Sequence, residues 1–253
     1  MASSASLSPA SSRVVAPSTR RRSTRRASSS SSVSTRCAAE AGGTIRREVL
    51  DRGDRGKINT VDDRNWYSQP RLCTHVDDEF LAQLTQLYRE RIPPGGKVLD
   101  MCSSWISHYP DGYKAGRISG LGMNEDELKK NPILNDYVVR DLNEDPTLPF
   151  EDNTFDVVTN AVSVDYLTRP LEMMKEVNRV LKPGGLAVMS FSNRCFPTKA
   201  VSIWTSTGDL DHIWIVGAYY HFAGGFEPPA AQDISPKPGK SDPMYVVYAR
   251  KQA

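Results

Sequence analysis

The sequence predicts an α/β fold with a mostly parallel sheet, and three observations support this class. Short apolar segments alternate with helical patterns between residues 97 and 192, which is the order expected of βαβ units. Phe155 and residues 156–160 form the near-continuous apolar run that a parallel sheet buries on both faces. Turns rich in Pro and Gly at residues 93–96 and 182–185 separate these segments. The 253 residues leave room for one domain of ordinary size and an extension.

The first 39 residues differ in composition from the rest of the chain. They contain seven arginines, and no acidic residue precedes Glu40. The rest of the chain contains the other 25 of the 32 basic residues and all 30 acidic residues, so it is mildly acidic. A mildly acidic domain argues against a nucleic-acid partner. An Arg-rich, Ser-rich and acid-poor N-terminus is typical either of a disordered nucleic-acid arm or of an organelle transit peptide. Its high serine content and the opening Met-Ala-Ser-Ser favour a chloroplast transit peptide over residues 1–40.

Two further segments follow from composition. Residues 41–72 are polar and irregular, with Trp66 and Tyr67 as aromatics that we expect to pack across a pocket mouth or a core edge. Residues 73–253 form the α/β domain, and no apolar run approaches the length of a transmembrane segment. The cysteines show no paired spacing, so neither a disulfide framework nor a metal site is expected from residues 37, 73, 102 and 195.

The first half of the domain is predicted as follows. A helix runs from about residue 77, where Thr74 and Asp77 have capping-box-like spacing, to Pro93. Its apolar face contains Phe80, Leu81, Leu84, Leu87 and Tyr88. Strands are expected at 97–101 and 117–121. Between them, Pro110, Gly112 and Gly116 limit any helix to one or two turns.

The second half continues the alternation. A short acidic helix opens at Asn124 and is limited by Pro132, and strands follow at 137–140 and 156–160. A helix from about Pro170, with Thr168 available as its cap, buries the stripe Leu171, Met174, Val177 and Leu181. A strand at 186–190 comes next. We expect helices at 197–204 and 209–223, then a closing hairpin of strands near 227–234 and 244–249, joined by the loop 235–242.

Three motifs in order carry a family resemblance. They are Val98-Leu99-Asp100, then LPF-x-D-x-x-FD-V-V at 148–158, then EV-x-RVLKPGG at 176–185. This order resembles class I S-adenosylmethionine-dependent methyltransferases over residues 75–250, and it is most similar to the type 11 branch that includes quinone-biosynthesis enzymes. The resemblance implies a Rossmann-like seven-stranded, mostly parallel sheet with helices on both faces and a C-terminal antiparallel hairpin. It also implies that the cofactor S-adenosylmethionine lies over the carboxyl ends of the first strands, which agrees with the rule for open α/β sheets.

The turn after the first strand departs from the family pattern Asp-x-Gly-x-Gly-x-Gly. Asp100 is present, but Cys102, Ser104 and Ile106 occupy the three glycine positions. A residue with a Cβ held in a sparse backbone conformation costs about 1–3 kcal/mol, and micromolar binding amounts to about 8 kcal/mol. We therefore expect a remodelled turn, with Ile106 the hardest residue to accommodate.

The resemblance also implies where the cofactor is held. The family acid that binds the ribose falls at Gly122, although Asn124 or Glu125 can reach the same place, and Asp141 matches the position beside the adenine. The implied cofactor-binding residues are Asp100, Cys102, Ser103, Ser104, Gly122, Asn124, Asp141, Leu142 and Ala161.

The catalytic candidates have two interpretations each. Asp165 and Tyr166 follow the fourth strand at the family position between cofactor and acceptor, where they can act as base and hydrogen-bonding wall, or Asp165 can be a solvated cap. His108 is either a base facing the substrate or a satisfied, half-exposed residue. Trp105 is either a pocket wall or a core residue. Trp66, Tyr67 and residues 209–223 either form a lid or are surface aromatics, and Cys73, His75 and Cys195 are interpreted as structural.

Two functional hypotheses follow. The first is a methyltransferase imported into the plastid, acting on a small, lipophilic or aromatic acceptor, located in the stroma or associated peripherally with thylakoids or plastoglobules. The second is a protein of the same fold that no longer catalyses and instead binds a metabolite or a protein partner. The missing glycines and ribose acid favour the second hypothesis, whereas Asp100, Asp141 and the intact region of the fourth strand favour the first.

Overall fold

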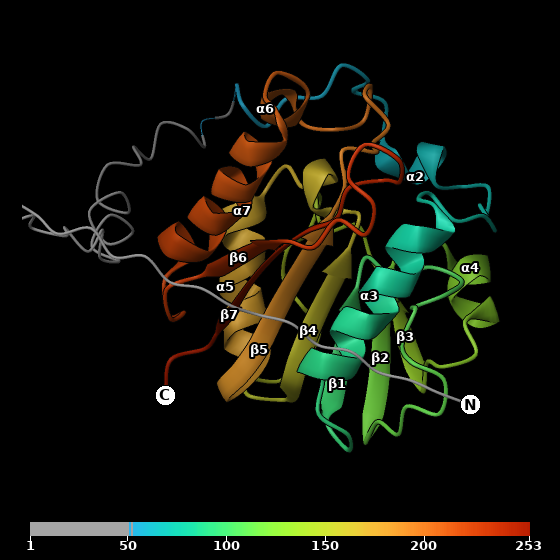
Figure 1. Cartoon of the computed structure of the whole chain (residues 1–253), viewed down its shortest axis with the longest axis vertical. Coiled ribbons are helices and arrows are strands. Elements are labelled where there is room, and N and C mark those ends of the chain that lie inside the picture. Colours follow the sequence, from blue (N-terminus) through green and yellow to red (C-terminus); the bar gives the residue numbers. More distant parts are fainter. Residues whose placement is uncertain (1–50, 52) are drawn as a thin grey trace, which may run out of the picture. The chain divides into compact units, whose positions relative to one another are not determined.

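The computed structural model describes residue 51 and residues 53–253, so the predicted transit peptide and the start of the polar extension lie outside the described residues. One seven-stranded sheet forms the centre, in the order β3-β2-β1-β4-β5-β7-β6 (Figure 1). All neighbours are parallel except β7, which is antiparallel to β5 and β6, so the predicted sheet and its C-terminal hairpin are confirmed. The strands are β1 (Lys97–Met101), β2 (Arg117–Gly122), β3 (Asp136–Val139), β4 (Phe155–Ala161), β5 (Leu181–Phe191), β6 (Ala230–Asp233) and β7 (Tyr245–Arg250).

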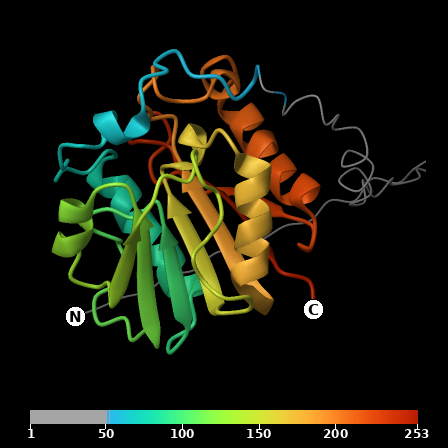
Figure 2. The ribbon, with the colours of Figure 1, turned by 180° about the vertical axis from the view of Figure 1, so that it is seen from behind.

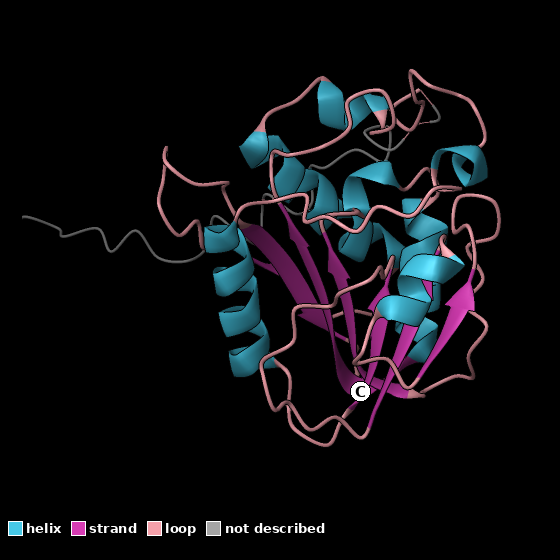
Figure 3. Ribbon diagram, turned by 90° about the vertical axis from the view of Figure 1, so that its right-hand side faces the viewer, coloured by secondary structure: helices cyan, strands magenta, loops and turns pink. Residues whose placement is uncertain are grey.

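Helices cover both faces of the sheet, as Figures 1, 2 and 3 show from three sides. Val98 joins the core cluster under α3 and its neighbour Leu99 joins the cluster under α5 and α7, because successive strand residues point to opposite faces. No helix in the described part of the chain is long and apolar enough to cross a bilayer. The helices are α2 (Asp63–Trp66), α3 (Asp78–Arg91), α4 (Glu125–Lys130), the 3₁₀ turn η2 (Val164–Tyr166), α5 (Pro170–Val180), α6 (Ser202–Thr205) and α7 (Asp209–Ala223).

Two predicted helix caps are wrong in detail. The carboxylate of Asp77, not Thr74, caps α3 by accepting from the Phe80 amide at 2.9 Å. Thr168 does not cap α5, because its amide and hydroxyl both donate to Asn143 Oδ1, at 2.7 and 3.1 Å. Asn143 thereby ties the loop after β3 to the start of α5.

The segment between β1 and β2 contains no helix. Residues 103–116 run irregularly, and Tyr109 fills the space beside the sheet by stacking between Tyr88 and Tyr113, with ring centroids 5.0 and 5.7 Å apart. The Tyr109 hydroxyl lies 2.7 Å from Thr159 Oγ1, so the buried polar atom is satisfied. An aromatic stack therefore covers the part of the face where a crossover helix would otherwise pack.

Residues 53–76, which we call the strap, cross the carboxyl edge of the sheet (Figure 1). An isolated bridge pairs Lys57 with Val201, and the Asn59 amide donates to the Thr198 carbonyl at 2.8 Å. Asp63 of α2 receives the ammonium groups of Lys57 and Lys199 at 2.6 and 2.8 Å, and all three side chains are nearly buried. This ion cluster fixes the strap to the α/β body.

Candidate functional site

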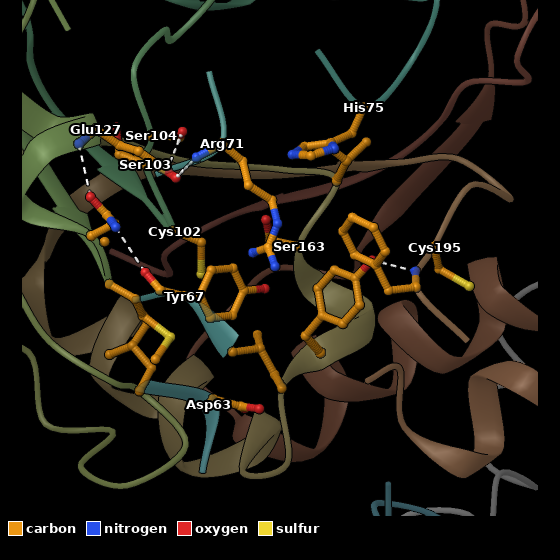
Figure 4. A pocket seen from close by; sticks show the side chains of 18 of the residues that line it. Asp63, Tyr67, Arg71, His75, Cys102, Ser103, Ser104, Glu127, Ser163 and Cys195 are labelled. Carbon is orange, nitrogen blue, oxygen red and sulfur yellow. Dashed lines mark hydrogen bonds between the residues drawn. The ribbon is translucent and has the colours of Figure 1, made fainter. Parts of the chain in front are cut away.

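A cavity of about 460 Å³ lies at the carboxyl edge of the sheet, under the strap (Figure 4). Its size is typical of small-molecule sites, which span roughly 300–1,000 Å³. It sits where the strand order reverses between β1 and β4, the place where open α/β sheets bind ligands. Its walls are strap residues and the segments that follow β1, β2, β3, β4 and β5.

Asp100 shapes the turn after β1 and does not line the cavity. Its Oδ2 accepts from the hydroxyls of Ser103 and Ser107, at 2.6 and 2.7 Å. Burial raises the pKa of Asp100 to about 6, although these hydroxyl groups oppose the shift. Side-chain hydrogen bonds thus hold a turn that relatives build with glycines, and the predicted direct contact of Asp100 with a cofactor is not supported.

The turn after β1 is remodelled, as expected from the replacement of its three glycines. Cys102 keeps the left-handed conformation of a glycine position, with φ of 58°, and His108, two residues beyond the last glycine position, is also left-handed, with φ of 55°. Ile106 is 37% exposed and lies outside the cavity lining, so it does not fill the cleft. Cys102, Ser103 and Ser104 line the cavity, as predicted from the family positions.

Gly122, at the position of the ribose acid, lines the cavity but has no room for a side chain. A Cβ there would clash with the carbonyl oxygen of Ser103, because the Ser103 amide donates to the Leu121 carbonyl at 2.8 Å and holds the turn against β2. The remodelled turn and an acidic side chain at position 122 therefore exclude each other.

Glu127 of α4 supplies a carboxylate to the cavity instead. Its Oε2 accepts from the Ser104 hydroxyl at 2.6 Å, and its Oε1 accepts from the Arg71 amide at 2.7 Å. Asn124 caps α4 and holds the Tyr67 carbonyl at 2.8 Å, whereas Glu125 is exposed and pairs with Lys129. Sequence reasoning missed Glu127 because its position three residues after Asn124 matches a helix cap.

The predicted adenine-side residues line the cavity together. Asp141 accepts from the Asn143 amide at 2.8 Å through Oδ1, and Leu142 is buried beside it. Asn143 donates to Asp63 Oδ2 at 3.1 Å, which links this loop to the strap.

After β4, the residues that line the cavity begin one position later than predicted. Val162 and Ser163 line the cavity, whereas Ala161 does not. Val162 has φ of 44°, a strained conformation for a β-branched residue, while its amide donates to the Ser190 carbonyl at 2.8 Å. Backbone strain thus occurs at the cavity after both β1 and β4.

Of the three catalytic candidates, only Tyr166 lines the cavity. Its hydroxyl accepts from the Phe196 amide at 2.9 Å. Asp165 points into the interior, where burial raises its pKa to about 7 and Oδ2 has no hydrogen-bond partner among the described residues. His108 also lies outside the lining, and burial lowers its pKa. Neither residue is placed to act on a ligand in the cavity.

Of the residues interpreted as either a lid or surface aromatics, only Tyr67 of the strap contributes to the cavity wall. Tyr67 lines the cavity, whereas Trp66 packs edge-on against Phe196 behind it and no residue of α7 reaches the lining. His75 and Cys195, interpreted from the sequence as structural, also line the cavity. Isolated residues of these types carry no local signal, so only the folded chain could reveal their positions.

The chain is similar in sequence to known methyltransferases. A family profile described as a methyltransferase domain, of type 11, matches residues 119–189. The chain is 36% identical over 103 residues to demethylmenaquinone methyltransferase of Staphylococcus haemolyticus, covering 37% of this chain and 42% of that protein. It is 33% identical over 113 residues to the enzyme of the same name from Bacillus cereus, covering 38% and 45%. The chain thus spans less than half the length of these curated relatives.

A solved structure shares the fold. A SAM-dependent methyltransferase from Aquifex aeolicus superposes with a TM-score of 0.51 at 19% identity, over 68% of this chain and 91% of that one. The profile match runs from β2 to β5 and contains both of the longer sequence motifs, at 148–158 and 176–185. The strand order and the profile together confirm the resemblance seen in the motifs. Residues 119–189 thus match the type 11 methyltransferase domain, and the described domain has the fold of a SAM-dependent methyltransferase.

Proposed function

We propose that this chain is an S-adenosylmethionine-dependent methyltransferase of the plastid that acts on a small, lipophilic or aromatic acceptor. One observation carries the proposal: the cavity stays open at the carboxyl ends of β1 and β2 although the three turn glycines are replaced. The replacing side chains of Cys102 and Ser104 form its wall and Ile106 lies outside it. The demethylmenaquinone methyltransferases among the relatives support a ring-shaped, lipophilic acceptor.

The residues present fit the cofactor. Met123 and Leu142 offer apolar surface for a nucleoside, and Asp141 and Glu127 offer carboxylates at its edge. The hydroxyl and backbone groups of Ser103 and Ser104 face the same space. When bound, S-adenosylmethionine supplies an electrophilic methyl group on sulfur.

The other side of the cavity suits an aromatic acceptor. Tyr67, Tyr166 and Phe196 contribute rings from the strap, from η2 and from the loop after β5. Methyl transfer from a sulfonium mainly needs positioning and exclusion of water. The strap covers the cavity, and the hydrogen bond from the Phe196 amide to the Tyr166 hydroxyl fixes the Tyr166 ring. The proposed methyl transfer therefore requires no buried base.

Calorimetry with S-adenosylmethionine tests the cofactor. We expect micromolar binding to the full chain, and Asp141→Ala should weaken it more than tenfold because this carboxylate borders the nucleoside side. Asp126→Ala is the matched control, since Asp126 is exposed on neighbouring α4 and should leave the affinity unchanged. The absence of heat and of a thermal shift at millimolar cofactor would contradict the proposal.

A second function is favoured by a specific observation. The Ser103 carbonyl excludes any acid at Gly122, which removes a usual ribose contact. A protein that binds a metabolite without catalysis is consistent with this loss. Incubation with methyl-labelled cofactor and a panel of phenols and quinols separates the two functions, because only the enzyme transfers label.

The plastid location rests on the N-terminal composition. A fluorescent fusion of residues 1–45 should enter chloroplasts, and a diffuse cytosolic signal would contradict the proposal. We further propose peripheral contact with plastid membranes, which flotation of the processed protein with plastid-lipid vesicles tests.

A further inference from the structure

Arg71 is the one cavity arginine that has no acidic partner in the described part of the chain. The guanidinium groups of Arg140 and Arg194, which also line the cavity, approach Asp145 at 2.8 Å and Asp242 at 3.7 Å. No side-chain nitrogen of Arg71 makes a hydrogen bond or salt bridge with a described residue, and its buried Nη1 has no partner at all.

The acids around Arg71 are committed elsewhere. Asp63 is paired with two lysines, and Asp141 accepts from the backbone of its own loop. Glu127 is engaged by the Ser104 hydroxyl and by the main-chain amide of Arg71 itself. The last contact holds the Arg71 backbone in place and leaves its side chain free to extend along the cavity.

Aromatic rings position the guanidinium without satisfying it. The Arg71 Cζ lies 4.7, 5.7 and 5.9 Å from the ring centroids of Trp66, Tyr67 and Phe196. Figure 4 shows the side chain reaching from Ser104 and Glu127 toward Ser163, beside the Tyr67 ring. Ring faces stabilise the charge but offer no acceptor comparable to an oxygen, and a buried donor without a partner destabilises the protein.

We propose that Arg71 is the receptor for an anionic oxygen, a carboxylate or a phenolate, on the ligand that fills this cavity. The planar guanidinium presents paired N–H donors that match the two oxygens of a carboxylate or can both donate to a single phenolate oxygen, and desolvation in the cavity strengthens the contact. The inference builds on the proposed function, which supplies two sources of this chemistry. One is the amino-acid carboxylate of the cofactor, and the other is an ionised aromatic acceptor.

Binding to two matched ligand pairs distinguishes the sources. S-adenosylhomocysteine carries the amino-acid carboxylate and 5′-methylthioadenosine lacks it, whereas salicylate is anionic and salicylamide is neutral. We expect Arg71→Met to weaken at least one anionic ligand tenfold or more and to change its uncharged counterpart less than twofold. A loss confined to S-adenosylhomocysteine assigns the cofactor tail to Arg71, and a loss confined to salicylate assigns the acceptor.

Controls keep these results interpretable. Arg64→Met removes an exposed arginine of the same strap that is paired with Asp62 and Glu144 and lies outside the cavity lining, so it should leave both affinity ratios unchanged. Arg71→Gln serves if the Met variant does not fold, since the amide of residue 71 still donates to Glu127. Unchanged ratios for both pairs in the Arg71 variant would overturn the inference. Failure of the wild-type chain to bind either nucleoside would contradict the proposed function while the salicylate pair still tests Arg71.

Discussion

The two edges of the sheet place left-handed backbone on different kinds of residue. At the amino edge, the left-handed residues are Gly95 before β1, Gly184 in the first residues of β5 and Asn153 before β4, with φ of 77°, 75° and 53°. An added Cβ would meet nothing within 4 Å at either glycine, and asparagine is among the residue types that tolerate this conformation. At the carboxyl edge, Cys102 and Val162 adopt φ of 58° and 44° although both carry a Cβ. The edge that only reverses the chain is relaxed, whereas the edge that borders the cavity is strained, as is common at ligand sites.

The two edges also differ in how they treat carboxylates close to β4. Asp156, at the amino edge, has a lowered pKa because hydrogen bonds from Lys182 and the Lys97 amide outweigh partial burial. Asp165, beyond the carboxyl edge, is buried with one oxygen unpartnered, and its pKa is raised to about 7. The ionised carboxylate of Asp165 therefore destabilises the fold at the carboxyl edge, whereas that of Asp156 stabilises the fold at the amino edge.

The largest expected effect comes from adding a side chain at the carboxyl edge. Gly122→Ala places a Cβ against the Ser103 carbonyl, and two backbone segments must separate, so we expect a loss of about 3 kcal/mol or more in unfolding free energy. Gly120→Ala on the same strand is the matched control, because it meets only the flexible Leu134 side chain and should cost about 1 kcal/mol. Equal losses in urea unfolding would show that the turn can move away from β2.

The next effect depends on pH. Because the folded pKa of Asp165 lies above its unfolded value of about 3.9, its contribution to stability falls as pH rises from about 4 to about 7 and is constant above that. Asp165→Asn keeps the neutral shape, so we expect a gain of up to about 4 kcal/mol at pH 8 and none at pH 4. Asp156→Asn should destabilise at pH 8 and lose this effect on acidification, the opposite sign at the opposite edge. If the change in unfolding free energy had the same pH dependence in both variants, the proposed difference between the two edges would be wrong.

The smallest effect concerns backbone strain itself. Cys102→Gly relieves a left-handed residue and should stabilise the fold by about 1 kcal/mol, whereas Gly184→Ala introduces one and should destabilise it by a similar amount. Thermal unfolding of both variants measures the difference. If Cys102→Gly is destabilising, the thiol contributes packing that exceeds the strain.

Much of the fold could be predicted because its signals are local. The period of α5 and the apolar run of β4 place these elements within one or two residues of the structure. The glycine-poor turn was also predicted to be remodelled, since Cys and Ile have different backbone preferences from glycine. The predicted cofactor-side residues that line the cavity lie at the end of a strand or within three residues of it, as Gly122, Ser104 and Asp141 do.

The rest of the site could not be predicted, for reasons of distance along the chain. Glu127 meets the Arg71 amide across 56 residues, and Asp63 meets Lys199 across 136. His75 and Cys195 reach the same cavity from opposite ends of the domain. Conversely, Asp165 belongs to a strand end that does border the cavity, but its side chain turns inward with η2.

The sequence by itself determined the order of helices and strands, the parallel sheet and the edge at which a ligand site lies, because hydrophobic period and turn chemistry act over a few residues. Only the tertiary structure decided which side chains face that site. The carboxyl ends of the strands converge there, so a strap carrying Arg71, a turn held by Asp100 and a helix carrying Glu127 meet although no local pattern joins them. The Ser103 carbonyl likewise excludes a side chain at Gly122 through contact in space and not through sequence proximity.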